Sequence, residues 1–161
     1  MSTPSNQTDT IETDPMVAIE FEDASKAAKA RTGGTAISTP KGGTAMVSRY
    51  GVAFAVSSGT VNGGAAGVSV TRNGGLSLSG DGGASIAYEY GSAACGAHGV
   101  AFCKTPGPVG LGRVKGGAGA TLVISWVVKD TTNPANDMTF SKSVRVGETA
   151  DGDGIEIVPG T

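Results

Sequence analysis

The chain has 161 residues, and its composition is 27 glycines, 5% aromatic residues and 16% charged residues. A chain so poor in large side chains cannot build a thick core, yet its charge is too low for a disordered protein. A net charge of −2 and a pI near 5.3 argue against nucleic-acid binding, which needs a basic surface. No apolar run reaches the roughly 18 residues of a membrane-spanning helix, so we expect no membrane segment.

The first residues lack the basic and apolar regions of a signal peptide, so we expect a cytoplasmic protein. Residues 1–15 are acidic and rich in Ser and Thr, which predicts a flexible tail. In residues 16–25 the segment "MVAIEF" alternates apolar and other residues, which predicts a strand that begins or caps the fold.

Residues 26–114 form an eight-residue repeat of eleven octads, one of which carries an extra residue. Counted from a leading glycine, the third and fifth positions hold almost only small residues. Such a period is the sequence signature of a solenoid, in which stacked strands bury together what one strand cannot bury alone. Glycine leads nine successive octads: Gly43, Gly51, Gly59, Gly67, Gly75, Gly83, Gly91, Gly99 and Gly107.

Alternate octads differ at the second and fourth positions, and this difference sets the length of one coil. In one set these positions are apolar, as in Val52 and Phe54, and in the other they are mixed, as in Thr60 and Asn62. Two octads per coil, or sixteen residues, explain the alternation. We therefore predict an all-β protein, a two-sheet parallel β-solenoid with two unlike faces and a cap of C-terminal strands.

Side chains alternate across a strand, so the third and fifth positions share one side and the second and fourth share the other. We predict that the small positions line the interior, because Lys29, Thr60 and Asn62 would be costly in a dry core. The opposite register, with the bulky positions inside, would give a thicker core but would not explain the alternation. The favoured register predicts an apolar interaction face on one sheet: Ile37, Val52, Phe54, Val68, Val70, Ile86, Val100 and Phe102.

Residues 115–161 are predicted to form capping strands, because the ends of a solenoid expose unpaired backbone. The β-branched segment "ATLVISWVVKD" and the alternating segment "MTFSKSVRV" are two of these strands. They are expected either to cap the last coil or to fold back over the apolar face. The predicted cap residues share one side of the first strand: Leu122, Ile124, Trp126 and Val128.

No combination of residues forms a catalytic signature, so we expect a protein that is not an enzyme. The only histidine, His98, follows Cys95 by three residues, but the repeat places Cys95 and Cys103 in the small fifth column. Buried thiols are inert and stay reduced in the cytoplasm, although a disulfide across the stack is an alternative.

We also expect neither a metal nor a cofactor. One histidine and two cysteines do not give a zinc spacing, and Asp81 stands alone where a calcium-binding repeat would need many aspartates. The glycine-rich segment 107–117 matches no phosphate-binding motif.

The octads "GVAFAVSS", "GVSVTRNG", "GGLSLSGDG" and "GSAACGAH", followed by "GGAGATLVISWVVKD" and "GETADGDGIEIVPGT", resemble a group of Gly/Ala/Ser-rich β-solenoid proteins common in phage and prophage genomes. The resemblance covers roughly residues 26–158 and implies a phage or mobile-element origin. Trimeric adhesin heads share the small-residue coil but use a different coil length. Insect-type ice-binding solenoids carry regular threonine rows, whereas here Leu76 interrupts a row after Thr44 and Thr60.

Together these features predict a protein-interaction module whose partner is another protein. The resemblance suggests a phage-encoded inhibitor of a host defence protein such as a CRISPR effector. A structural virion or assembly protein and an ice-binding-like solenoid are the alternatives. An apolar face of this size needs a cover, and the C-terminal strands, a second copy in a homodimer, or a foreign protein are the three candidates.

Overall fold

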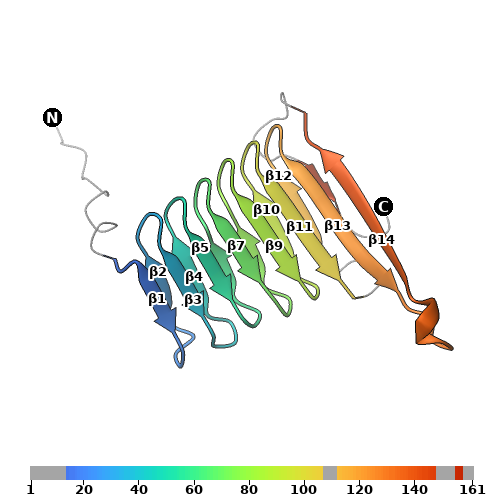
Figure 1. Ribbon diagram of the computed structural model, residues 1–161, viewed down its shortest axis with the longest axis horizontal. Helices are drawn as coiled ribbons and strands as arrows, with labels where there is room; N and C mark the ends of the chain where they lie inside the picture. The colour runs from blue at the N-terminus through green and yellow to red at the C-terminus, as the bar shows by residue number, and fades with distance from the viewer. Residues whose placement is uncertain (1–13, 107–111, 148–154, 158–161) are drawn as a thin grey trace.

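Short strands alternate between two sheets along the part of the chain that the computed structural model describes, which is residues 14–106, 112–147 and 155–157. Each coil contributes one strand to each sheet, and the coils stack side by side in chain order (Figure 1). From β4 to β11, paired residues in neighbouring coils are sixteen apart, as in Val52 and Val68. The predicted two-sheet parallel β-solenoid with two octads per coil is therefore confirmed. The predicted flexible tail lies almost wholly outside the described residues.

The odd-numbered strands from β1 to β13, together with β14, form sheet A, and the even-numbered strands from β2 to β12, together with β15, form sheet B. Sheet A contains, in spatial order, β1 (Val17–Glu20), β3 (Thr35–Ser38), β5 (Val52–Ala55), β7 (Val68–Thr71), β9 (Ala84–Tyr88), β11 (Val100–Thr105), β13 (Thr121–Val128) and β14 (Met138–Arg145). Sheet B contains β2 (Ala27–Ala30), β4 (Thr44–Val47), β6 (Thr60–Asn62), β8 (Leu76–Leu78), β10 (Ser92–Cys95), β12 (Arg113–Gly116) and β15 (Ile155–Ile157).

The interior is lined by the small third and fifth positions of the octads. In β5 the side chains of Ala53 and Ala55 are fully buried, whereas those of Val52 and Phe54 lie on the outer side. The favoured register is therefore right and the opposite register is wrong. The third-position side chains of both sheets are all buried: Ala36, Ala45, Ala53, Val61, Ser69, Ser77, Ser85, Ala93, Ala101 and Val114.

The leading glycines are required because the backbones of neighbouring coils meet at these positions. A Cβ atom added to Gly75 would lie 2.5 Å from the carbonyl oxygen of Gly59, and one added to Gly91 would lie 2.7 Å from that of Gly75. Each of these carbonyls accepts a hydrogen bond from the first strand residue of the next coil, as Gly59 does from Leu76 at 2.9 Å. Any side chain would separate the coils and break these hydrogen bonds.

A group of serines occupies the middle of the lining, between an N-terminal and a C-terminal block of apolar core. The Ser77 hydroxyl donates to the Ser69 carbonyl oxygen at 2.9 Å, and the Ser85 hydroxyl donates to the Ala94 carbonyl oxygen at 2.6 Å. The hydroxyls also bond to one another, as in Ser69 and Ser85 at 3.1 Å. Because these groups have partners, their burial carries little penalty.

The last strand of the repeat in sheet B begins later than octad counting predicts. In β12 it is Val114 that pairs with Ala93, at the third position that the count gave to Val109. The octad assigned to residues 107–114 is therefore wrong in register, because five extra residues enter the turn between β11 and β12. Those residues, 107–111, lie outside the described part of the chain.

The C-terminal strands lengthen the two sheets and do not fold back over the face of sheet A. β14 pairs antiparallel with β13, and a three-residue 3₁₀ helix (Pro134–Asn136) lies in the loop between them. β15 pairs antiparallel with β12 at the end of sheet B. Figure 1 shows β13 and β14 side by side at the end of the stack, longer than the strands before them.

The four predicted cap residues lie on β13, but two of them belong to the core itself. Leu122 and Ile124 are fully buried and pack in the same cluster as Ala101 and Cys103. Trp126 packs against this cluster and stacks on Phe140, with ring centroids 5.9 Å apart. Val128 is half-buried at the end of the strand.

Candidate interaction face

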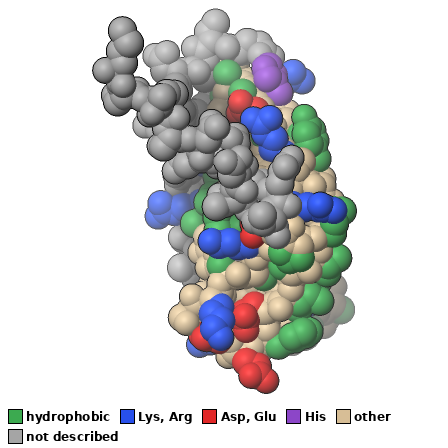
Figure 2. Space-filling model, turned by 90° about the vertical axis from the view of Figure 1, so that its left-hand side faces the viewer, with side chains coloured by type: hydrophobic (Ala, Val, Ile, Leu, Met, Phe, Trp, Pro, Cys, Tyr) green, Lys and Arg blue, Asp and Glu red, His purple; other side chains and the backbone are tan. Residues whose placement is uncertain are grey.

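The outer side of sheet A carries all eight residues of the predicted interaction face. Val52 and Val100 are 43% and 44% exposed, and the other six are half-buried by their neighbours in the same rows. The space-filling view, seen from the N-terminal end, shows hydrophobic side chains gathered along one side of the body (Figure 2).

Two straight rows of side chains make up this surface, because the strands pair without a shift. The second-position row runs through Val17, Thr35, Val52, Val68, Ala84, Val100 and Thr121. The fourth-position row runs through Ile19, Ile37, Phe54, Val70, Ile86, Phe102 and Val123. We call these two rows the apolar face.

The apolar face is longer than the sequence predicted. Val17 and Ile19 of β1 extend it at one end, where they are 61% and 44% exposed, and Val123 of β13 extends it at the other. The sequence predicts residues 16–25 only as a strand that begins or caps the fold, and residues 115–161 only as capping strands. The signal that identifies the extra residues is the alternation within "MVAIEF" and "ATLVIS", read in register with the octads.

Sheet B presents a different outer surface. Its rows contain Thr44, Thr60 and Leu76 at the second position, and Lys29, Met46 and Asn62 at the fourth. Arg113 and Lys115 of β12 continue the same rows. The two faces are therefore unlike in chemistry, as the alternation of the octads predicts.

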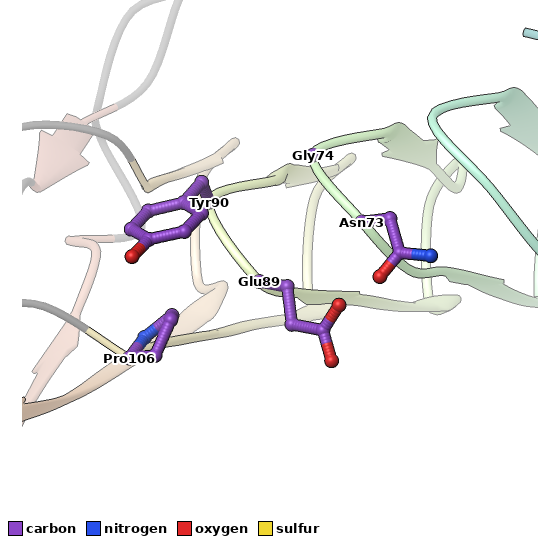
Figure 3. Close-up of a pocket in the computed structure, with 5 residues that line it drawn as sticks. All are labelled: Asn73, Gly74, Glu89, Tyr90 and Pro106. Carbon is purple, nitrogen blue, oxygen red and sulfur yellow. The ribbon is translucent and has the colours of Figure 1, made fainter.

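Two shallow pockets lie beside the apolar face, at the corner where β7, β9 and β11 end. One, of about 300 Å³, is lined by Phe54, Val70, Arg72, Tyr88 and Glu89. The other, of about 400 Å³, is lined by Asn73, Gly74, Glu89, Tyr90 and Pro106. Figure 3 shows the rings of Tyr90 and Pro106 on one side of this second pocket and the polar ends of Glu89 and Asn73 on the other.

Charged and aromatic groups at this corner contact one another. Arg72 and Glu89 form an exposed ion pair at 3.9 Å, which contributes little to stability because solvent screens it. Tyr88 packs edge to face on Phe102, with ring centroids 6.2 Å apart. The corner thus places aromatic rings and both signs of charge next to the apolar face.

The backbone of this corner is strained at Glu89 and Tyr90. Both have left-handed φ angles, 55° and 72°, and the corresponding pair in the preceding coil, Asn73 and Gly74, has 53° and 84°. Asn-Gly is the preferred pair for a turn with two left-handed residues. For a residue with a large side chain, the left-handed conformation costs on the order of 1 kcal/mol of stability. The corner therefore holds Glu89 and Tyr90 beside the pocket at some cost in stability.

The two thiols lie in the lining of the solenoid, and the histidine lies at a corner. Cys95 and Cys103 are both buried and unpaired with each other. Burial raises the pKa of both thiols, that of Cys103 to about 11, so they are protonated at neutral pH. His98 lies at a corner with a left-handed φ of 55°, and its backbone N–H donates to Ala118.

Within residues 14–106, 112–147 and 155–157, no three His, Cys, Asp or Glu side chains come together in a way that would hold a metal ion. Over the same residues, no helix has the length and hydrophobicity to cross a bilayer.

No family model matches the sequence, and comparison with curated proteins and with solved structures finds no significant match. Function is therefore inferred from the geometry of the two faces and of the corner beside the apolar face.

Proposed function

We propose that the protein is a non-enzymatic interaction module that docks on another protein through its apolar face. The observation that supports this most directly is the fourth-position row, in which seven successive strands each present a large apolar side chain and no charge. With about 4.8 Å between strands the row is roughly 29 Å long. Two such rows cover on the order of 400 Å², the size of the largest apolar patch on a typical monomer, and such a patch is often a binding site.

The corner pockets supply what a flat apolar surface lacks, which is specificity. Protein interfaces are rich in Tyr and Arg at their centre and have a polar rim. Arg72, Tyr88, Glu89 and Tyr90 line the pockets beside the rows. We therefore propose a foreign protein with a flat apolar surface as the partner, oriented by polar and aromatic contacts at this corner.

Inhibition of a host defence protein by a phage-encoded chain is the specific form of this proposal, and it depends on the resemblance described above. A role in virion structure or assembly predicts instead that the chain copurifies with assembled particles. An ice-binding role would need a regular threonine row, and the row of Thr44 and Thr60 on sheet B continues with Leu76.

The test compares the two faces at the same octad position in one coil. Phe54→Glu places a charge on the apolar face, and Met46→Glu places the same charge at the fourth position of sheet B, where Met46 is 38% exposed. Affinity capture from the cell that carries the gene, quantified by mass spectrometry, is followed by titration of the purified partner. We expect Phe54→Glu to weaken binding at least about tenfold and Met46→Glu to leave it unchanged.

Both variants should remain folded, because both substitutions lie on the outer side of a strand, and Phe54→Glu should unfold at a somewhat lower temperature because the Phe54 ring is half-buried. Capture of the same proteins by both variants, or loss of binding with Met46→Glu alone, would contradict the proposal.

A further inference from the structure

We propose that β14 pairs edge to edge with β14 of a second copy, so that sheet A of one molecule continues into sheet A of the other. The starting observation is the length of this strand. β14 has eight residues, whereas the other three terminal strands, β1, β2 and β15, have four, four and three. Among the residues that the structure describes, β14 has a strand neighbour on one side only, which is β13 (Figure 1).

A long edge strand is a template for pairing, and proteins usually avoid one by shortening, bending or covering it. β14 pairs with β13 over its full length without a bulge, from Val128 opposite Met138 to Thr121 opposite Arg145. It contains no proline. Of the devices that protect an edge strand, its sequence carries only charge, at Lys142 and Arg145, so a pairing register must keep like charges apart.

The hydrogen bonds to β13 identify the backbone groups that point to the outer edge. Val146 donates its N–H to Ala120 at 2.8 Å, in the register that pairs β13 with β14. In an antiparallel ladder, alternate residues direct both N–H and C=O to the same side. Even-numbered residues therefore point to β13, and Thr139, Ser141, Ser143 and Arg145 point to the outer edge.

A twofold antiparallel pairing must place side chains of the same face opposite each other, so one residue lies opposite its own copy on the axis. The registers centred on Ser141 and on Lys142 give the longest overlap of β14 with its copy. A pair centred on Lys142 would set two ammonium groups against each other and is unfavourable. A pair centred on Ser141 sets Met138 against Val144 and Phe140 against Lys142, so that apolar side chains meet and no like charges do.

The register centred on Ser141 also pairs the ends of the strand by charge. It places Arg145 opposite Asp137 of the second copy, and by symmetry this occurs twice. Asp137 is half-buried, and its carboxylate already accepts from the Asp130 N–H at 3.0 Å and pairs with Lys129 at 3.8 Å, so Arg145 of the second copy would join an existing ion pair. Thr139 and Ser143 would face each other across the edge and, with Ser141 at the axis, exchange about six backbone hydrogen bonds.

An edge of this length buries less surface than a standard interface, so we expect a weak dimer with a dissociation constant on the order of micromolar or above. The twofold axis lies perpendicular to the sheet. Both apolar faces therefore lie on the same side of the dimer, which would have twice the docking surface. This inference does not depend on the proposed function, because it concerns a different surface.

The test uses two double variants that differ only in the sign of the charge at position 139. Thr139→Lys with Ser143→Lys sets lysines opposite each other across the edge, whereas Thr139→Glu with Ser143→Lys sets opposite charges there. Both residues are exposed and lie about 13 Å apart within one strand, so neither pair acts within the monomer. Sedimentation equilibrium over a concentration series measures the dissociation constant of each. We expect the Lys/Lys variant to weaken the dimer at least tenfold and the Glu/Lys variant to tighten it.

Ser141→Pro provides an independent test. It removes an N–H that points to the outer edge, so the bonds to β13 are kept while pairing is blocked. Ser141→Ala is its control and should dimerise as the wild type does. Hydrogen exchange at Thr139, Ser141 and Ser143 should slow with increasing protein concentration in the wild type and the Ala variant only. A wild type that stays monomeric at several hundred micromolar, or a dimer equally strong in both double variants, would overturn the proposal.

Discussion

The lining of the solenoid and its apolar face are made by the same strands, yet they obey different rules. In β5 the inward Ala53 and Ala55 are close in size to the inward residues of β3, β7, β9 and β11, whereas the outward Val52 and Phe54 have counterparts in sheet B as different as Thr60 and Asn62. The lining is limited by volume, because two sheets and the glycine rows leave room for little more than a methyl or hydroxyl group. The outer rows are limited only by what they contact, so they can carry the function.

The lining tolerates polarity better than bulk. Ser69, Ser77 and Ser85 are as deeply buried as the alanines around them, and each has a hydrogen-bond partner. At these positions a serine whose hydroxyl is hydrogen-bonded can therefore take the place of an alanine. Three predictions test this difference between the lining and the outer rows.

The largest effect is expected from adding bulk to the lining. Ala53→Leu inserts an isobutyl group at a fully buried position between backbones, and we expect it to lower the free energy of unfolding by about 3 kcal/mol. Val52→Leu adds bulk at the neighbouring outer position and should change it by less than about 0.5 kcal/mol. Urea unfolding of both variants measures the difference, and equal losses would show that the lining is not limited by volume.

An effect of intermediate size is expected from the buried thiol at high pH. Because burial raises the pKa of Cys103 from 9.0 to about 11, the unfolded chain loses this proton at a lower pH than the folded one. The free energy of unfolding should therefore fall as the pH rises from about 9 to about 11, by on the order of 2 kcal/mol. Cys103→Ala should lack this part of the pH dependence, while ionisation of Lys and Tyr affects both proteins alike. Parallel curves for the two proteins would contradict the assignment.

The smallest effect is expected from removing one hydroxyl. The Ser77 hydroxyl donates to Ser69 and accepts from the Ile86 N–H at 3.2 Å, so Ser77→Ala should cost about 1 kcal/mol. Ser92→Ala, on the outer side of the neighbouring strand of sheet B, should cost almost nothing. Thermal unfolding of the two variants gives the comparison. If Ser92→Ala lowered the melting temperature more than Ser77→Ala, the hydrogen bonds of the buried serines would not be what stabilises them in the lining.

Most of the fold could be predicted from the sequence because two periods are superimposed in it. The octad period of the small residues gives the strands, and the alternation of Val52 and Phe54 with Thr60 and Asn62 gives the coil and the inward side. Only a two-sheet coil places these residues in separate surroundings. The eight predicted face residues lie together on sheet A for this reason.

The features that could not be predicted are those that interrupt a period or depend on neighbouring coils. The five extra residues before β12 shift the register of Val114, and nothing in a glycine-rich segment shows where the winding resumes. Leu122 and Ile124 are larger than any earlier lining residue in sheet A. The sequence therefore predicts a cap at the place where the structure has one more strand of the solenoid. The left-handed φ angles of Glu89 and Tyr90 have no sequence signal, because neither residue favours that conformation.

The glycine rows also restrict how the gene for such a chain can change in length. Every coil presents the same surface to the next, as the stacking of Gly75 on Gly59 and Gly91 on Gly75 shows. A duplication or deletion of forty-eight nucleotides, one coil, would leave each remaining side chain inside or outside as before. Insertion or deletion of a single codon within a strand would move the inward side chains in the rest of that strand to the outer side. Only the turns could accommodate such a change in length. Relatives of this chain should therefore differ in length by whole coils or at the corners.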